Sequence, residues 1–221
     1  MIGVHAPASA RIGKIIQVLE RSYPEARCSL NFTNPLELLI ATILSAQCTD
    51  VLVNKVTEDL FKKYKAASDY ARANIDELAR EVSRVTFYRT KARSIQATCR
   101  ILAERFQSMV PNRMDDLLTL HGVARKTANV VLGNAFGMAE GIVVDTHVMR
   151  LSQRLGLSAQ ANRDKIEQDL MRLVPKARWI RFAHLMIEHG RKICKAKTPR
   201  CRECTIGKAL CPSYQAQHVT A

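Results

Sequence analysis

Apolar positions along the chain repeat with a helical period. Between residues 34 and 47 they recur at i, i+3, i+4, i+7 and i+8, which places them on one helix face. Asn34 suits the N-cap, Pro35 the first helical position, and Glu37 completes a capping-box-like pattern. The same signals predict further helices after residues 49–50, from 74–77, around 95–106, and at 114–120, 127–136, 148–155, 165–174 and 179–193.

One segment, EGIVVDTH at residues 140–147, departs from this period and is compatible with a short strand. The helical spacing resumes directly afterwards with Val148, Leu151 and Leu155. No sequence repeat, low-complexity tract or linker divides the chain. We therefore predict an all-α fold, in which any domain division depends on non-local packing.

Charge points to the class of partner. Thirty-four Lys and Arg stand against 20 Asp and Glu, a formal net charge of +14, which predicts a polyanion, with nucleic acid ahead of an anionic membrane surface. The chain has no apolar run of about 18 residues and no apolar signal core at its amino end. We expect no membrane association and a reducing compartment, where cysteines are thiols or metal ligands.

Four cysteines gather near the carboxyl end with the spacing C-x6-C-x2-C-x6-C. They are Cys194, Cys201, Cys204 and Cys211. Thiolates this close repel one another unless a cation or cluster neutralises them, so the spacing predicts a metal site. It leaves zinc and a four-iron cluster open. Cys28, Cys48 and Cys99 each stand alone among apolar residues and are interpreted as packing residues.

Cations surround this cysteine set. Most belong to a charged, solvated surface, which is the ordinary reason for such a run. Lys195, Lys197 and Arg200 differ because they lie in the short loop between the first two cysteines. A loop pinned by ligands presents its cations in a fixed geometry, so we expect these three to contact phosphates.

The stretch LLTLHGVARKTANVVL, residues 117–132, predicts a helix, a tight turn and a second helix. Leu120 and Val123 face inward, and Gly122 allows the positive φ that the turn requires. The N–H groups of the turn then form a phosphate cradle, although an ordinary helical hairpin has the same pattern. Lys126 stands at the helix start, where the partial positive charge of the helix makes a cation unfavourable.

Several of these segments resemble a known family. LHGVARKTANVVL is similar to the helix-hairpin-helix of the endonuclease III family of DNA glycosylases and AP lyases. VVDTHV, residues 143–148, resembles the segment with that family's catalytic aspartate, and the cysteine set resembles its iron-sulfur loop. LLIATILSAQCTD and FYRTKA extend the resemblance, which covers about residues 31–211.

The resemblance implies two helical domains with a DNA-binding cleft between them. A six-helix barrel domain containing the helix-hairpin-helix would span residues 28–138. Residues 1–27 and 139–221 would form an iron-sulfur cluster domain, with a [4Fe-4S] cluster on the four cysteines.

The resemblance also implies residue roles. Lys126 matches the nucleophile and Asp145 the essential carboxylate, which by local pattern alone is a helix N-cap. An attacking amine has to be neutral, and we expect the helix start, Arg125 and partial desolvation to disfavour its ammonium form. Gln47 matches the residue that fills the gap left by the extruded nucleotide, and Phe87 matches a wedge against the opposite strand. The predicted DNA-contacting residues are Gln47, Phe87, Tyr88, Arg89, Gly122, Ala124, Arg125, His147, Lys195, Lys197 and Arg200.

These implications add up to a functional prediction. We expect a base-excision repair enzyme that removes oxidised pyrimidines and cleaves abasic sites by β-elimination through a lysine Schiff base. Its partner would be double-stranded DNA with oxidised-base or abasic lesions. We expect a monomer in a prokaryotic cytoplasm, associated with the nucleoid, with an organellar or nuclear location as the alternative.

Two other functions stay open. A monofunctional glycosylase for mispaired adenine resembles this family but lacks the lysine at position 126. A non-catalytic, metal-stapled DNA-binding module would use Lys126 as a phosphate contact.

Three positions depart from the family pattern. His121 replaces the usual proline, Ala124 a usual glycine and Thr86 a usual glycine. If position 124 needs a positive φ, alanine there costs about 1 kcal/mol or more.

Overall fold

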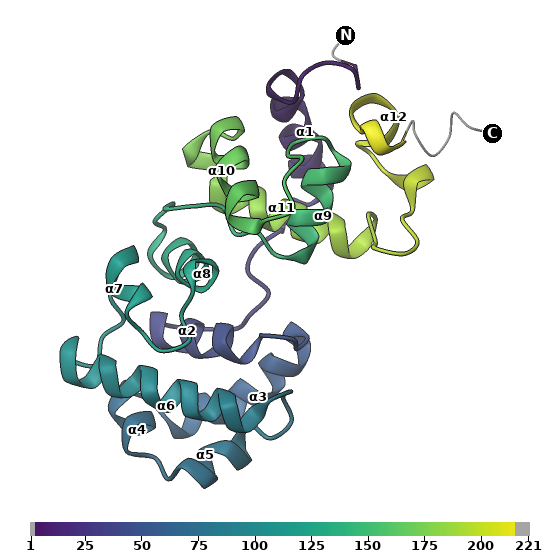
Figure 1. Ribbon diagram of the computed structural model, residues 1–221. Helices are drawn as coiled ribbons and strands as arrows, with labels where there is room; N and C mark the ends of the chain where they lie inside the picture. The colour runs from purple at the N-terminus through teal and green to yellow at the C-terminus, as the bar shows by residue number, and fades with distance from the viewer. Residues whose placement is uncertain (1–2, 215–221) are drawn as a thin grey trace. The chain divides into compact units, whose positions relative to one another are not determined.

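The structure is a computed structural model that describes residues 3–214, and within that range it is helical and contains no strand (Figure 1). The predicted all-α fold is confirmed. None of the helices in residues 3–214 is long and apolar enough to cross a membrane. The chain divides into two compact units: residues 28–140, and residues 1–27 together with 141–221.

The unit of residues 28–140 is built around a buried helix. Its helices are α2 (Pro35–Leu44), α3 (Asp50–Lys63), α4 (Ala67–Arg72), α5 (Ile75–Glu81), α6 (Tyr88–Arg105), α7 (Met114–Leu118) and α8 (Arg125–Phe136). Helix α2 is apolar on nearly every face, so it packs at the centre, against α3, α6 and α8. Its side chains from Leu36 to Leu44, apart from Glu37, are buried.

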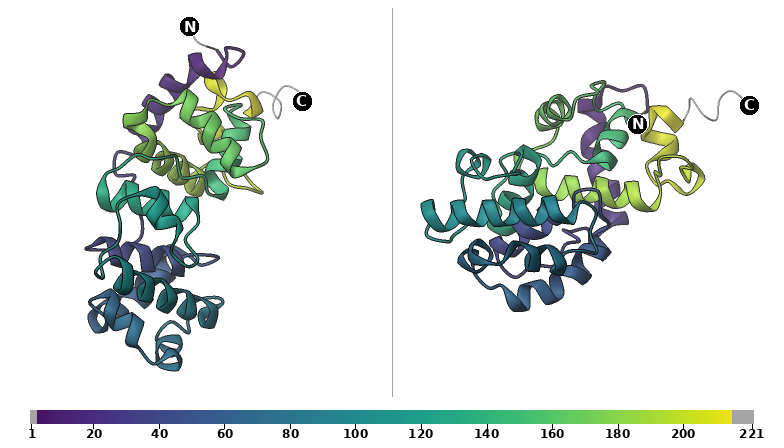
Figure 2. Two further views of the ribbon diagram at one scale, coloured as in Figure 1. Left: turned by 60° about the vertical axis from the view of Figure 1, so that its left-hand side comes forward. Right: turned by 60° about the horizontal axis from the view of Figure 1, so that its bottom comes forward.

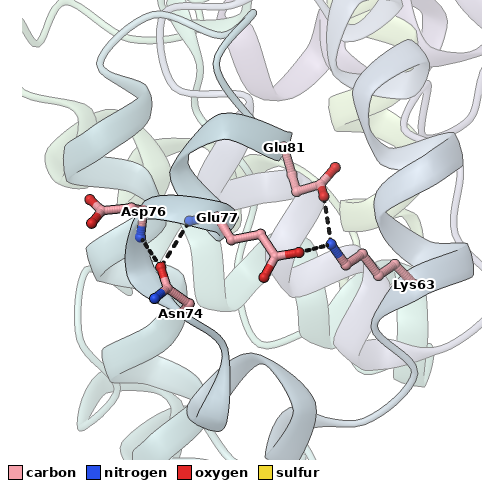
Figure 3. A network of polar contacts seen from close by, with 5 residues as sticks. All are labelled: Lys63, Asn74, Asp76, Glu77 and Glu81. Carbon is pink, nitrogen blue, oxygen red and sulfur yellow. Dashed lines mark hydrogen bonds and ion pairs between the residues drawn. The ribbon is translucent and has the colours of Figure 1, made fainter.

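Polar side chains fix the ends of these helices. The Asn34 side chain accepts the N–H of Glu37 at 3.0 Å and starts α2, as the sequence predicted. Asn74 starts α5 in the same way by accepting the N–H groups of Asp76 and Glu77 (Figure 3). From α3, the Lys63 ammonium reaches Glu77 and Glu81 of α5 at 2.5 and 2.7 Å (Figure 3). These exposed ion pairs contribute little to stability.

The second unit combines the amino end with the carboxyl region (Figures 1 and 2). Its elements are α1 (Ala8–Ser22), α9 (Thr146–Arg154), α10 (Arg163–Leu173), the 3-10 turn Lys176–Arg178, α11 (Trp179–Lys192), the 3-10 turn Cys201–Glu203 and α12 (Gly207–Leu210). Helix α11 packs against both α1 and α9. The buried Arg11 guanidinium of α1 donates to the carbonyl oxygens of Leu155 at 2.7 Å and Leu210 at 2.8 Å, which ties three segments together.

A glycine brings α9 and α11 into close contact. A Cβ atom placed on Gly190 of α11 would lie 2.9 Å from both Cβ and Nδ1 of His147. Non-bonded carbon atoms prefer a separation of about 3.5–4.0 Å, so only glycine fits at position 190 without displacing a neighbour.

The strand alternative at residues 140–147 is not formed, because residues 3–214 contain no strand and Thr146 and His147 already belong to α9. Three helices were not predicted. Helix α1 was not predicted, although Ile12, Ile15, Ile16 and Leu19 follow the helical period and are buried. Helices α4 and α12, of six and four residues, were also not predicted, and neither begins with a side-chain N-cap that would have marked it.

Candidate functional site

The predicted hairpin forms as α7, a tight turn and α8. Gly122 has φ +73°, as the turn requires, and Leu120 and Val123 are buried beneath it. The buried Thr98 hydroxyl of α6 donates to the His121 carbonyl oxygen at 2.6 Å and so anchors the turn to the core. The turn is therefore positioned by an adjacent helix as well as by its own sequence.

The start of α8 exposes Lys126. The hydrogen bond from the Ala128 N–H to the Ala124 carbonyl oxygen, 3.0 Å, begins the helical series. The N–H groups of Arg125, Lys126 and Thr127 precede it and are directed beyond the helix end, beside the exposed Lys126 side chain. The predicted partial desolvation of Lys126 is therefore not provided by the protein alone.

The departure at Ala124 carries no backbone cost. Ala124 is the N-cap of α8 with φ −91° and ψ 169°, an extended conformation that any residue adopts. The positive φ that the sequence left open at this position lies instead at Gly122. Alanine therefore fits the hairpin without strain.

Two further predicted residues, Gln47 and Phe87, lie on neighbouring loops of the same unit. Both have a left-handed backbone, with φ +55° at Gln47 and +54° at Phe87. The Thr86 hydroxyl donates to the Gln47 carbonyl oxygen at 2.9 Å and joins the loops. Phe87 is 65% exposed, whereas Tyr88 packs against the core with the Arg89 guanidinium 5.4 Å from its ring centre.

In the other unit, Asp145 is the N-cap of α9. Its Oδ1 accepts the N–H groups of His147 and Val148, both at 2.8 Å. Both bonds end on one oxygen, so Oδ2 remains for another partner. The structural interpretation of Asp145 as a cap is thus compatible with a chemical role for its carboxylate.

Arginines of α9 link this helix end to the cysteine set. Arg150 donates to His147 Nδ1 at 3.1 Å and to the Cys194 carbonyl oxygen at 2.9 Å. Because a guanidinium only donates, Nδ1 accepts, and a neutral His147 carries its proton on Nε2. Arg154, one turn further, donates to Cys194 Sγ at 3.2 Å and to the carbonyl oxygens of Lys195 and Ala196.

The four cysteines line a single cavity, together with His189, Arg154 and apolar side chains. Burial raises the pKa of the Cys204 and Cys211 thiols, and nearby thiolate charges raise both further, against opposing backbone hydrogen bonds. Buried sulfurs that repel one another when ionised are a donor set suited to a cationic centre. Within residues 3–214, no three His, Cys, Asp or Glu side chains converge closely enough for a single metal ion.

A buried histidine adjoins this cavity. His189 Nε2 lies 3.5 Å from Cys204 Sγ, and its Nδ1 lies 2.9 Å from the Tyr23 hydroxyl of α1. Burial lowers the pKa of His189 to about 4. An uncharged, hydrogen-bonded imidazole therefore lies beside one of the four sulfurs.

The cations of the cysteine loop are exposed, but they differ in their partners. Lys195 and Lys197 extend from a loop whose backbone Arg154 holds. Arg200 instead contacts Glu203 through two nitrogens, at 2.8 and 2.5 Å. Part of the Arg200 charge is thus compensated locally, and the two lysines are the freer cations of the loop.

The predicted residues fall into four groups. Gln47 lies beside the Phe87–Arg89 segment, and residues 122–126 share the hairpin. His147 adjoins Asp145, and the loop cations adjoin the four cysteines. Lys126 belongs to the 28–140 unit and Asp145 to the other unit.

Comparison with known proteins gives the class. The family model described as HhH-GPD superfamily base excision DNA repair protein matches residues 40–176, which is more than half of the chain. The range includes the hairpin, Lys126 and Asp145. The fold and the hairpin are thus those of a helix-hairpin-helix protein of base-excision DNA repair.

Similar proteins narrow the class. Endonuclease III of Synechocystis sp. is 50% identical over 211 residues, 96% of each chain, and that of Bacillus subtilis is 46% identical over 87% of this chain and 88% of its own. A solved non-covalent endonuclease III–DNA complex has a TM-score of 0.89 at 42% identity and covers 95% of this chain and 97% of that chain. The chain belongs to the endonuclease III family.

Several residues of the site were not predicted from the sequence. They are Thr86 as a loop contact, Thr98, Arg150, Arg154, His189 and also Lys91 of α6, whose ammonium contacts the carbonyl oxygens of Leu44 and Ala46. Arg150 and Arg154 carried a usable signal, because cations four residues apart share one helix face. The contacts of the others join segments far apart in the chain, which sequence spacing does not reveal.

Proposed function

We propose that the protein is a bifunctional DNA glycosylase and AP lyase that removes oxidised pyrimidines from double-stranded DNA. The observation that carries the proposal is Lys126, an exposed amine at the start of α8 beside the phosphate-binding turn, in a chain of the endonuclease III family. The net charge of +14 supports a DNA substrate.

The hairpin would bind the DNA backbone next to the lesion. The N–H groups at the start of α8 and the Gly122 turn suit a phosphate, and the partial positive charge of the helix end adds to the attraction. Lys126 then lies beside the bound strand. Because the free protein leaves Lys126 exposed, bound DNA would have to exclude water from its amine.

The chemistry requires the damaged nucleotide outside the duplex, because C1′ is inaccessible within the stack. Lys126 Nζ forms a bond to C1′ as the base leaves with the bonding electrons and a proton. Opening of the sugar ring gives an imine between Nζ and C1′. Loss of a C2′ proton then expels the 3′ phosphate by β-elimination.

Asp145 would act through the oxygen that does not cap α9. Its carboxylate stabilises positive charge that develops on the sugar, or accepts a proton from the amine. Because Oδ1 is fixed by two backbone N–H groups, the orientation of Oδ2 is fixed as well. The cap thus serves to position the carboxylate.

The four cysteines would hold a [4Fe-4S] cluster. Their common cavity and the mutual repulsion of their thiolates support such a group. When bound, the cluster would cross-link the segment from Cys194 to Cys211 and fix the loop with Lys195 and Lys197. The test is the visible absorption spectrum with iron and sulfide analysis: four of each per chain supports the assignment, and zinc alone contradicts it.

The remaining DNA contacts are those that the family resemblance implies. We assign DNA binding to these residues: Gln47, Phe87, Tyr88, Arg89, Gly122, Ala124, Arg125, His147, Lys195, Lys197 and Arg200. Residues 28–138 would form the barrel domain, and residues 1–27 with 139–221 the cluster domain. The relatives are bacterial proteins, which supports a prokaryotic cytoplasm, and we propose that the protein works there on chromosomal DNA as a monomer.

The proposal is tested with a duplex that contains one oxidised pyrimidine. The protein should release the base and nick the strand, and Lys126→Ala should do neither while still binding the duplex. Binding without base release or nicking by the unchanged protein would support the non-catalytic DNA-binding alternative. Release of mispaired adenine without nicking would support the monofunctional one.

A further inference from the structure

Two loops of the 28–140 unit are joined by side chains that have no role in the proposed chemistry. Residues 45–49 connect α2 to α3, and residues 82–87 connect α5 to α6. Thr86 donates its hydroxyl to the Gln47 carbonyl oxygen at 2.9 Å. Its N–H donates to Cys48 Sγ at 3.3 Å, and its Oγ1 lies 3.0 Å from the same sulfur.

A second side chain, Lys91 of α6, also contacts the Gln47 loop. It is only 6% exposed, and its ammonium contacts the carbonyl oxygens of Leu44 at 2.8 Å and Ala46 at 2.6 Å, and Cys48 Sγ at 3.4 Å. An ammonium has three donors, and its three acceptors here lie at the last residue of α2 and in the Gln47 loop that follows. A buried lysine is thus fully used to hold the path of this loop.

Thr86 and Lys91 also change the pKa of the Cys48 thiol that they contact. Burial raises the pKa of the Cys48 thiol, but the Thr86 hydrogen bonds and the Lys91 charge outweigh burial and hold the pKa below its usual value. The contacts of Thr86 and Lys91 with Cys48 therefore favour the thiolate form of its sulfur. They add to the contacts of Thr86 and Lys91 with backbone carbonyl oxygens.

Gln47 and Phe87, which these contacts flank, both have a strained, left-handed backbone. Within residues 3–214 only four non-glycine residues have a positive φ, and Gln47 and Phe87 are two of them. Such a conformation persists only when surrounding contacts determine it. For Gln47 these contacts are the bonds from Thr86 to its own carbonyl and from Lys91 to the preceding carbonyl.

We propose that Thr86 and Lys91 are positioning residues that join the Gln47 loop and the Phe87 loop into one preorganised DNA-inserting unit. This inference rests on the proposed function and on the roles that the family resemblance implies, in which Gln47 fills the gap and Phe87 wedges the opposite strand. Ordering both loops before DNA arrives removes an entropic cost from extrusion of the nucleotide. Thr86, which departs from the glycine usual in the family, thereby acquires a specific function in this chain.

The test separates extrusion from later chemistry. Thr86→Val keeps the shape of the side chain and removes the hydroxyl, whereas Thr86→Ser keeps the hydroxyl. Thr90→Val, on the exposed face of α6, is the matched control. Single-turnover rates are measured on a duplex with an oxidised pyrimidine and on a duplex with a preformed abasic site, which has no base to unstack.

We expect Thr86→Val to slow base excision about tenfold, the effect of losing one well-placed hydrogen bond. Nicking of the abasic duplex should change less than about twofold, and Thr86→Ser and Thr90→Val should match the unchanged protein. Equal loss on both duplexes, or no loss on either, would overturn the inference. If Thr86→Val does not fold, Thr86→Gly takes its place in the same comparison.

Amide hydrogen exchange provides a readout independent of activity. Residues 45–49 should exchange faster in Thr86→Val than in the unchanged protein, and Thr90→Val should leave them unaltered. Unchanged exchange would refute the connection between the loops. Failure of the unchanged protein to excise any base would instead refute the proposed function, whatever the exchange result.

Discussion

The contact between α9 and α11 gives a stability prediction with its own internal control. Gly13 and Gly190 both lie inside helices of the same unit, but a Cβ on Gly13 would meet nothing within 4 Å, whereas one on Gly190 would lie 2.9 Å from His147 Cβ and Nδ1. Replacing an exposed helical glycine with alanine stabilises by about 1 kcal/mol. Gly13→Ala should therefore raise Tm by about 2–4 °C.

Gly190→Ala has the same helix-forming advantage but also forces α9 and α11 apart. Overpacking of this kind costs about 1–3 kcal/mol, so the two variants should differ by that amount in free energy of unfolding. His147 is two residues from Asp145, so Gly190→Ala should also slow base excision, while Gly13→Ala should not.

The measurement is chemical unfolding of both variants beside the unchanged protein, together with single-turnover excision. Similar stabilisation by the two substitutions would mean that α9 and α11 are not in the close contact described. If Gly190→Ala is destabilised but keeps full excision activity, the contact between α9 and α11 does not position Asp145.

Two further predictions concern Asp145 and His184. Asp145→Asn should abolish base excision but change the free energy of unfolding by less than about 0.5 kcal/mol, because asparagine caps a helix as well as aspartate does. Asp145→Ala should abolish excision and also lower the free energy of unfolding by about 1 kcal/mol. Unfolding and excision assays on both variants check this, and an active Asp145→Asn would contradict the role of the carboxylate. Burial, with the charges of Arg181 and Arg191, lowers the pKa of His184 from 6.5 to about 4. Since the folded state favours neutral His184, its contribution to stability is complete above about pH 6.5 and is lost as the pH falls towards 4. Unfolding is measured from pH 4 to 7, where the slope of the unfolding free energy against pH gives the difference in bound protons between the unfolded and folded states. His184→Gln should reduce this difference by up to one proton, and an unchanged slope would refute the lowered pKa of His184.

Local chemistry made several elements of the structure predictable from the sequence. Asn34, Pro35 and Glu37 form their cap within four residues, and the start of α2 was predicted correctly. The cysteine spacing and the Gly122 turn are also short-range patterns. Each depends on residues near one another in the chain.

The remaining features depend on contacts between distant residues. Thr86 and the Gln47 carbonyl are 39 positions apart, Arg150 and the Cys194 carbonyl 44, and Arg11 and the Leu210 carbonyl 199. Sequence alone gives no means of knowing that these groups meet. The exposure of Lys126 is another example, because it depends on which segments pack around the start of α8.

The central claim is that Lys126 forms a covalent bond with the sugar of the damaged nucleotide. The most direct measurement is borohydride reduction of a mixture of the protein and a duplex with one abasic site, followed by mass spectrometry of the cross-linked peptide. We predict a covalent complex with the sugar on Lys126, and none with Lys126→Ala. A cross-link on another residue, or no cross-link in a preparation that binds the duplex, would contradict the account.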